Sequence, residues 1–151
     1  MKGIDMKTVY SGISLSFLII LLFVTPVIGS DWVEYGRSKS GNVYSYNKVN
    51  IKHSIKGIVQ VSCKYDFSDE GREEYIQKLR DREMSTKRYE KLSHTLNLLE
   101  IDCRNGMYRI VSITYHDTDG HVTDSYSSDE QDWSNIPPKT IEDTLRKKVC
   151  K

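Results

Sequence analysis

Leucine, isoleucine, valine and phenylalanine are scarce in this sequence. They supply only 24 of the 122 residues that follow position 29, which is close to the lower limit for a domain stabilised by its hydrophobic core alone. Nine tyrosines and two tryptophans in the same 122 residues partly make up for the shortage. We therefore expect aromatic rings to fill much of the interior and a covalent cross-link to support it.

The chain also lacks a long apolar run. Its main one, at residues 13–24, has twelve residues and would rise about 18 Å as a helix, whereas the hydrocarbon core of a bilayer is about 30 Å thick. Lys2 and Lys7 precede the run. A basic start followed by a short apolar stretch is typical of a secretory signal peptide, and less so of a membrane anchor.

A candidate cleavage site follows the apolar run. Val27 and Gly29 are small enough for the −3 and −1 positions of a signal peptidase site. We predict that residues 1–29 are removed and that residues 30–151 form one exported domain with no stable membrane span. That domain is expected in the periplasm, on the cell surface or outside the cell. The first cysteine after the run is Cys63, so the sequence predicts no lipid anchor.

An excess of basic residues is absent as well. Residues 30–151 hold 20 basic and 20 acidic side chains, because Lys2, Lys7 and Asp5 fall in the predicted signal peptide. A neutral chain without basic clusters lacks the charge pattern expected of a protein that binds nucleic acid or lipid headgroups. The sequence therefore predicts no nucleic-acid partner.

Catalytic motifs are missing too. The four histidines are His53, His94, His116 and His121, and no HExxH, GxSxG, GxxxxGK or CxxC pattern accompanies them. We predict that the protein is not an enzyme and that it has no cofactor. An envelope hydrolase is a third-ranked hypothesis, because it would require the fold alone to place a Ser, Cys or Asp beside a histidine.

Three residues are weak candidates for ligand binding. His116 and His121 flank a predicted turn at residues 117–120 and could approach each other across two strands as a metal or haem ligand pair. Cys63 lies on the apolar side of a predicted strand, where a cysteine is usually packed but can also be a reactive or intermolecular thiol. No third ligand is indicated, so we predict no metal site.

The three cysteines of the exported domain allow one intramolecular disulfide and three pairings. Loop entropy does not choose among them, because the loop formula gives similar stabilities of about 4 kcal/mol for closure onto Cys150 from either partner. Cys150 ends a terminal helical segment that would fray unless it were held, and Cys103 ends an apolar strand. We favour Cys103 with Cys150, which leaves Cys63 as a small buried residue.

Six segments have patterns typical of β-strands. Residues 55–67 alternate apolar and polar side chains, which predicts a strand with one face toward solvent. Asn105 and Gly106 lie between two apolar runs and predict a hairpin turn. The predicted strands are residues 32–35, 42–46, 55–67, 92–103, 107–115 and 121–126.

Two segments have patterns typical of helices. Ser68 can cap a highly charged helix that runs to about residue 84 and has a thin apolar stripe, so we expect it at the edge of the domain. Thr140 can cap residues 141–149, which have one apolar face and end in basic residues. Together these elements predict an α+β fold. It consists of an antiparallel sheet of about six strands with a peripheral charged helix and a C-terminal helix docked on the sheet by a disulfide.

The order of several short motifs resembles the surface-adhesin protein E family. The motifs are Trp32 with Tyr35 and Gly36, Glu100 to Cys103 followed by Tyr108-Arg109-Ile110, Trp133 with Ile136-Pro137-Pro138, and a final Val149-Cys150. The resemblance covers essentially the whole predicted domain. It implies an exported bacterial protein with an antiparallel sheet and a C-terminal helix tethered by a disulfide.

The same resemblance implies an adhesin that binds host extracellular-matrix or serum proteins and can form a homodimer. Our leading hypothesis is therefore a non-catalytic exported binding protein whose partner is a protein or a cell-envelope component. The alternative hypothesis is a periplasmic carrier of a small ligand, haem or a metal that uses His116, His121 or Cys63. No binding residue of the family is matched to a position of this chain.

Overall fold

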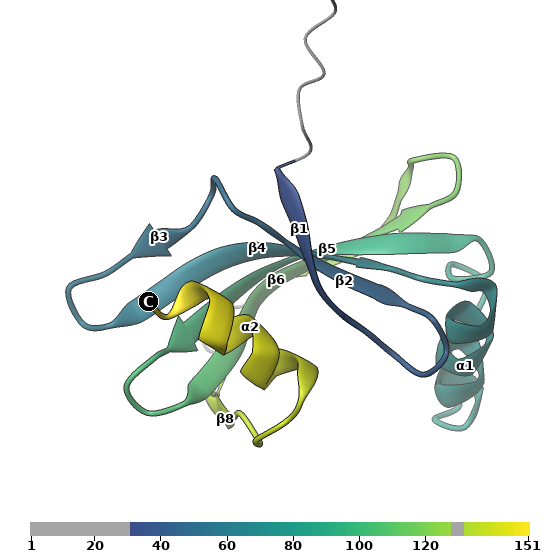
Figure 1. Ribbon diagram of the computed structural model, residues 1–151. Coiled ribbons are helices and arrows are strands. Elements are labelled where there is room, and N and C mark those ends of the chain that lie inside the picture. Colours follow the sequence, from purple (N-terminus) through teal and green to yellow (C-terminus); the bar gives the residue numbers. More distant parts are fainter. Residues whose placement is uncertain (1–30, 128–131) are drawn as a thin grey trace, which may run out of the picture.

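The structure is a computed structural model that describes residues 31–127 and 132–151. In these residues one antiparallel sheet has the strand order β1-β2-β4-β5-β6-β7, with β3 paired to β4 and β8 paired to β6. Two helices pack against the sheet (Figure 1). The strands are β1 (Trp32–Arg37), β2 (Val43–Asn47), β3 (Lys52–His53), β4 (Ile58–Asp66), β5 (Leu92–Asp102), β6 (Met107–Asp117), β7 (Val122–Ser127) and β8 (Ser134–Asn135), and the helices are α1 (Asp69–Arg80) and α2 (Ile141–Val149).

The predicted signal peptide at residues 1–29 lies outside the described residues, so its cleavage stays a prediction. Within the described part of the chain, neither helix combines the length and the apolar character needed to cross a bilayer.

Both helices lie on the same face of the sheet (Figure 1). We call this the covered face, and on β4 it carries Val59, Val61 and Cys63, which are 2%, 0% and 0% exposed. The opposite face, which we call the open face, carries the intervening residues Gln60 and Ser62, which are partly exposed. The alternation predicted for this strand is therefore confirmed.

The interior consists of two clusters at opposite ends of the covered face. At one end, Leu145 and Val149 of α2 pack on Leu99 and Ile101 of β5. At the other end, α1 contributes to a smaller cluster with Tyr89 and Leu92. Tyrosine rings extend both clusters, as the shortage of aliphatic residues predicts: Tyr35, Tyr44, Tyr46, Tyr65 and Tyr108 border the first, and Tyr75 and Tyr115 border the second.

Helix α2 begins and ends where the sequence predicts. The Thr140 side chain accepts a hydrogen bond from the backbone N–H of Asp143 at 3.2 Å, which caps the helix. A disulfide joins Cys103 at the end of β5 to Cys150 at the end of α2, with Cα atoms 5.6 Å apart. The predicted pairing and the docking of α2 on the sheet are both confirmed.

Helix α1 is shorter than the sequence predicts. Ser68 caps it by accepting the backbone N–H of Gly71 at 2.9 Å, but the helix ends at Arg80 and not near residue 84. Glu83 takes a left-handed φ of 56°, and the N–H of Met84 returns to the carbonyl of Leu79. A hydrogen bond of this kind typically ends a helix. The sequence pattern does not reveal it, because helix-forming residues continue past Arg80.

Two strands were not predicted, and one strand begins later than predicted. β3 and β8 are two-residue strands that pair with β4 and β6 respectively. Two residues are too few to show the alternation of apolar and polar side chains that predicts a strand. β4 begins at Ile58 and not at residue 55, because a turn closed by a hydrogen bond from Gly57 to Ser54 precedes it. Gly57 has a φ of +79°, which a glycine adopts without strain.

Candidate binding surfaces

Cys63 is buried on the covered face beside Tyr35 and Tyr65. Burial raises the pKa of the Cys63 thiol to about 12, and a hydrogen bond with Tyr35 opposes this rise only in part. The thiol is therefore protonated at neutral pH, and the thiol form is a poor nucleophile and metal ligand. In this structure the Cys63 side chain is a small packed group.

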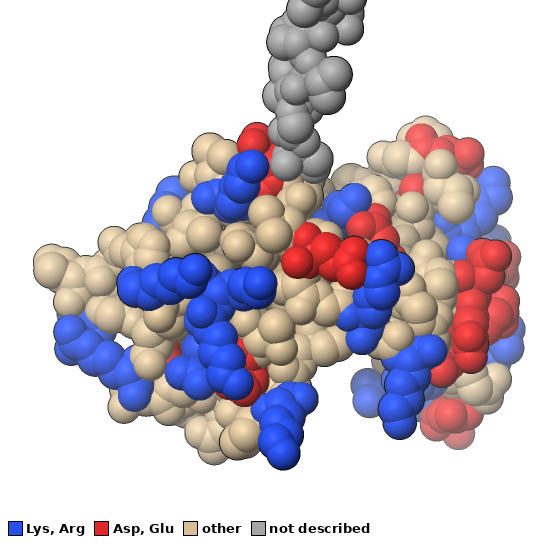
Figure 2. Space-filling model, viewed as in Figure 1, with Lys and Arg blue, Asp and Glu red and all other residues tan. Residues whose placement is uncertain are grey.

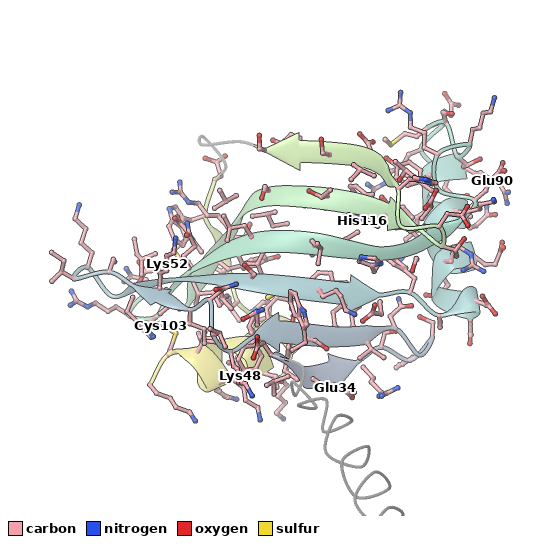
Figure 3. All side chains as sticks on the ribbon, turned by 90° about the horizontal axis from the view of Figure 1, so that it is seen from above. Glu34, Lys48, Lys52, Glu90, Cys103 and His116 are labelled. Atoms are coloured by element: carbon pink, nitrogen blue, oxygen red, sulfur yellow. A yellow bond between two sulfur atoms is a disulfide. The ribbon has the colours of Figure 1, made fainter. Side chains whose placement is uncertain are left out.

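The open face holds a stacked pair of histidines. His94 of β5 and His116 of β6 are aligned across the two strands, and their rings are 4.7 Å apart between centroids and 3° from parallel. Burial, and then the neighbouring His116, lower the pKa of His94, while Asp66 opposes the shift. His116 Nε2 is buried and has no hydrogen-bond partner among the described residues. Figure 3, drawn from above the sheet, labels His116.

This histidine pair predicts a pH-dependent stability. The pKa of His94 in the folded protein lies below its ordinary value of 6.5, so the unfolded chain binds this proton more readily. The resulting stability is fully present above pH 6.5 and is lost as the pH falls toward the folded pKa. We expect His94→Gln to flatten the pH dependence of the free energy of unfolding between pH 7 and about 5.

Urea unfolding at several pH values measures this effect. The control is His53→Gln, because His53 lies exposed on β3. Identical slopes for the wild type and His94→Gln would contradict the prediction.

His121 lies apart from this pair. Its side chain is 78% exposed and its Nδ1 is 3.4 Å from a carboxylate oxygen of Asp117. Asp119 completes a small group with these two residues, but Asp117 already accepts the backbone N–H groups of Asp119 and His121. The group is accounted for as a hairpin turn. The structure pairs His116 with His94 and places His121 in this turn.

Sequence reasoning missed His94 because of a β-bulge. Counted from the hairpin turn, Leu99 aligns with Ile110 and a regular ladder would continue to place Tyr115 opposite His94. The register shifts between Leu98 and Leu99, and this shift brings His116 opposite His94 instead. An extra residue in one strand leaves no clear mark in the sequence.

Polar and apolar groups alternate along the rest of the open face. Glu100 accepts hydrogen bonds from Arg109 at 2.7 and 2.8 Å and from Gln60 at 3.3 Å. The Arg109 guanidinium also lies 5.0 Å from the centre of the Trp133 ring. Leu96 is 37% exposed on the same face. Neither helix of the described residues lies over this face of the sheet (Figure 1).

Comparison with known proteins places the chain in a family. The sequence model of the surface-adhesin protein E family matches residues 32–151. A search of curated proteins found no match.

Two solved structures of Haemophilus influenzae protein E have similar folds. Crystal form II gives a TM-score of 0.51 at 12% sequence identity, covering 82% of this chain and 89% of that chain. The selenomethionine form gives 0.50 at 14% identity, covering 82% of this chain and 88% of that chain. These likenesses confirm the predicted α+β fold. Because the family model spans nearly all described residues, the chain belongs to the surface-adhesin protein E family.

Proposed function

We propose that this chain is an exported, non-catalytic binding protein of the adhesin type that recognises extracellular or cell-envelope macromolecules. Membership of a surface-adhesin family supports the general role. The observation that carries the proposal is the open face, a sheet surface that neither helix covers. Such a surface suits a macromolecular partner, since it offers contact area without a deep pocket.

The chemistry of the described residues also fits binding better than catalysis. The free thiol of Cys63 is buried, and burial raises its pKa to about 12. The histidines of the open face stack on each other, and Glu100 is held by Arg109. Groups held in this way can form a rigid contact surface, because little side-chain freedom remains to be lost on binding.

Capture experiments with the exported protein test this proposal. Immobilised protein is exposed to extracellular-matrix glycoproteins and, separately, to cell-envelope extracts, and saturable retention of a partner is expected. Leu96→Glu places a charge in the middle of the open face and should reduce retention roughly tenfold, since an unpaired charge in a contact surface is strongly unfavourable.

The matched control is Met84→Glu, because Met84 is an exposed apolar residue, 52% accessible, beyond the end of α1. Circular dichroism and thermal unfolding verify that both variants fold. The absence of any saturable partner in both sets would refute the function. Equal retention by both variants would refute the use of the open face.

A further inference from the structure

We propose that the end of the molecule beside the disulfide binds a linear sulfated polysaccharide. The proposal deepens the proposed function by naming a partner class, and it rests on that function only for the extracellular setting. The surface concerned is separate from the open face, so the two can be tested independently.

A cleft is present where the β5–β6 turn faces α2. Its volume is about 720 Å³, which lies within the range of small-molecule binding sites. The turn, the segment after β8 and α2 line it. Its polar and charged lining includes Arg104, Asn105, Asn135, Asp143, Arg146 and Lys147.

Basic side chains from distant parts of the chain meet at this cleft. Arg104 comes from the turn, and its side chain lies across Gly57, where an added Cβ would be 2.9 Å from Arg104 Nε. Arg146 and Lys147 come from α2. A second, smaller cleft, lined in part by both cysteines of the disulfide, shares Arg104 and adds Lys151. Basic residues therefore line both clefts that border the disulfide.

Asp143 in the lining and Asp102 beside Arg104 offset part of this charge, and the three cations leave a positive excess. Asp143 receives hydrogen bonds from Arg146 at 3.0 Å and from Lys147 at 2.7 Å, and its own side chain is only 6% exposed. Asp143 thus orients both cations, and its contact with Arg146 uses one N–H group of the five that the guanidinium carries. Asp102 lies beside Arg104, and its carboxylate accepts hydrogen bonds from the turn, including one from the Asn105 side chain at 2.7 Å, which orient it toward the turn backbone.

Basic side chains gather over one end of the molecule although the net charge is near zero. Blue side chains lie over α2 and the neighbouring turns, whereas red and blue side chains are mixed over the α1 end (Figure 2). Four acidic residues lie in the first two turns of α1: Asp69, Glu70, Glu73 and Glu74. A polyanion would be drawn to the disulfide end more than to the α1 end, because acidic and basic residues are mixed along α1.

The chemistry of the lining favours a sulfated sugar over other polyanions. Arginine guanidinium groups form paired hydrogen bonds with oxyanions, and asparagine amides such as those of Asn105 and Asn135 can bind hydroxyl groups. Single-stranded nucleic acids are held by aromatic rings on which bases stack, and the cleft lining contains none.

Binding to heparin, used as the probe sulfated polysaccharide, tests the proposal. Wild-type protein is expected to bind immobilised heparin in a salt-sensitive manner and to bind fully desulfated heparin much more weakly. Arg104→Gln with Lys147→Gln should weaken heparin binding roughly tenfold. Lys78→Gln with Arg82→Gln is the matched control, since it removes the same charges from exposed positions at the α1 end and should leave binding unchanged.

The outcomes of these binding measurements either support or overturn the proposed polysaccharide site. Equal losses in both double variants would show a general charge effect and overturn the proposal, as would equal binding of sulfated and desulfated heparin. Stronger binding to phosphatidylglycerol vesicles than to heparin would replace it with a lipid surface. If loss of the Lys147 contact to Asp143 unfolds the double variant, Arg104→Gln alone gives the test. Failure to bind heparin while Leu96 still governs protein capture would reject this inference and leave the proposed function intact.

Discussion

Replacing Cys103 and Cys150 together with alanine is expected to lower the free energy of unfolding by about 4 kcal/mol. The two residues are 47 positions apart, and a cross-link over a loop of that length removes much of the conformational entropy of the unfolded chain. A small domain has a total stability of only about 5–15 kcal/mol. The variant should therefore be marginally folded, with α2 detached from the sheet.

Urea unfolding of the oxidised wild type and the double variant measures this loss. Cys63→Ala is the control, because it removes a buried sulfur but keeps the cross-link. Reducing agent should weaken the wild type and Cys63→Ala by similar amounts and leave the double variant unchanged. A loss below about 1 kcal/mol in the double variant would contradict the expected role of the disulfide.

Gly71→Ala should destabilise the protein by about 2 kcal/mol, although the same change inside a helix usually stabilises it by about 1 kcal/mol. Gly71 lies in α1 and is buried. An added Cβ at this position would overlap the side-chain amide of Asn42. That amide accepts the backbone N–H of Ser68 at 3.0 Å, so displacing it also weakens the start of the helix.

A double-mutant cycle with Asn42→Ala tests this steric cause. Asn42→Ala alone removes the hydrogen bond to Ser68 and should be destabilising. Added to Gly71→Ala, it should instead recover part of the lost stability, because the overlapping amide is gone. Strictly additive losses in chemical unfolding would mean that α1 does not pack against the β1–β2 turn in the way described.

Local patterns in the sequence predicted much of the architecture. The alternation of Val59, Val61 and Cys63 with polar residues is a property of consecutive positions, and it held in β4 because one face of the strand is buried. The α2 bounds followed from the Thr140 cap and from an apolar stripe that ends at Val149. Such signals depend on residues only a few positions apart, so the same elements form in the folded domain.

The candidate surfaces depend on alignments between distant residues. A bulge at Leu98 and Leu99 decides that His94 stacks on His116, and no pattern of consecutive residues marks that bulge. Composition likewise predicted no basic cluster. The cleft between Arg104 and the two basic residues of α2 arises because the disulfide fastens the helix beside the β5–β6 turn.

The sequence by itself therefore indicated both helices, six of the eight strands that the structure describes, the favoured cross-link and the family. Propensity, capping and alternation act over a few residues, and the order of the motifs along the chain carries the family resemblance. The tertiary structure alone decided which charges and rings meet on a surface, since strand register and helix docking are set by packing over the whole domain. These groupings of side chains, and not the composition, define the surfaces on which this protein can bind a partner.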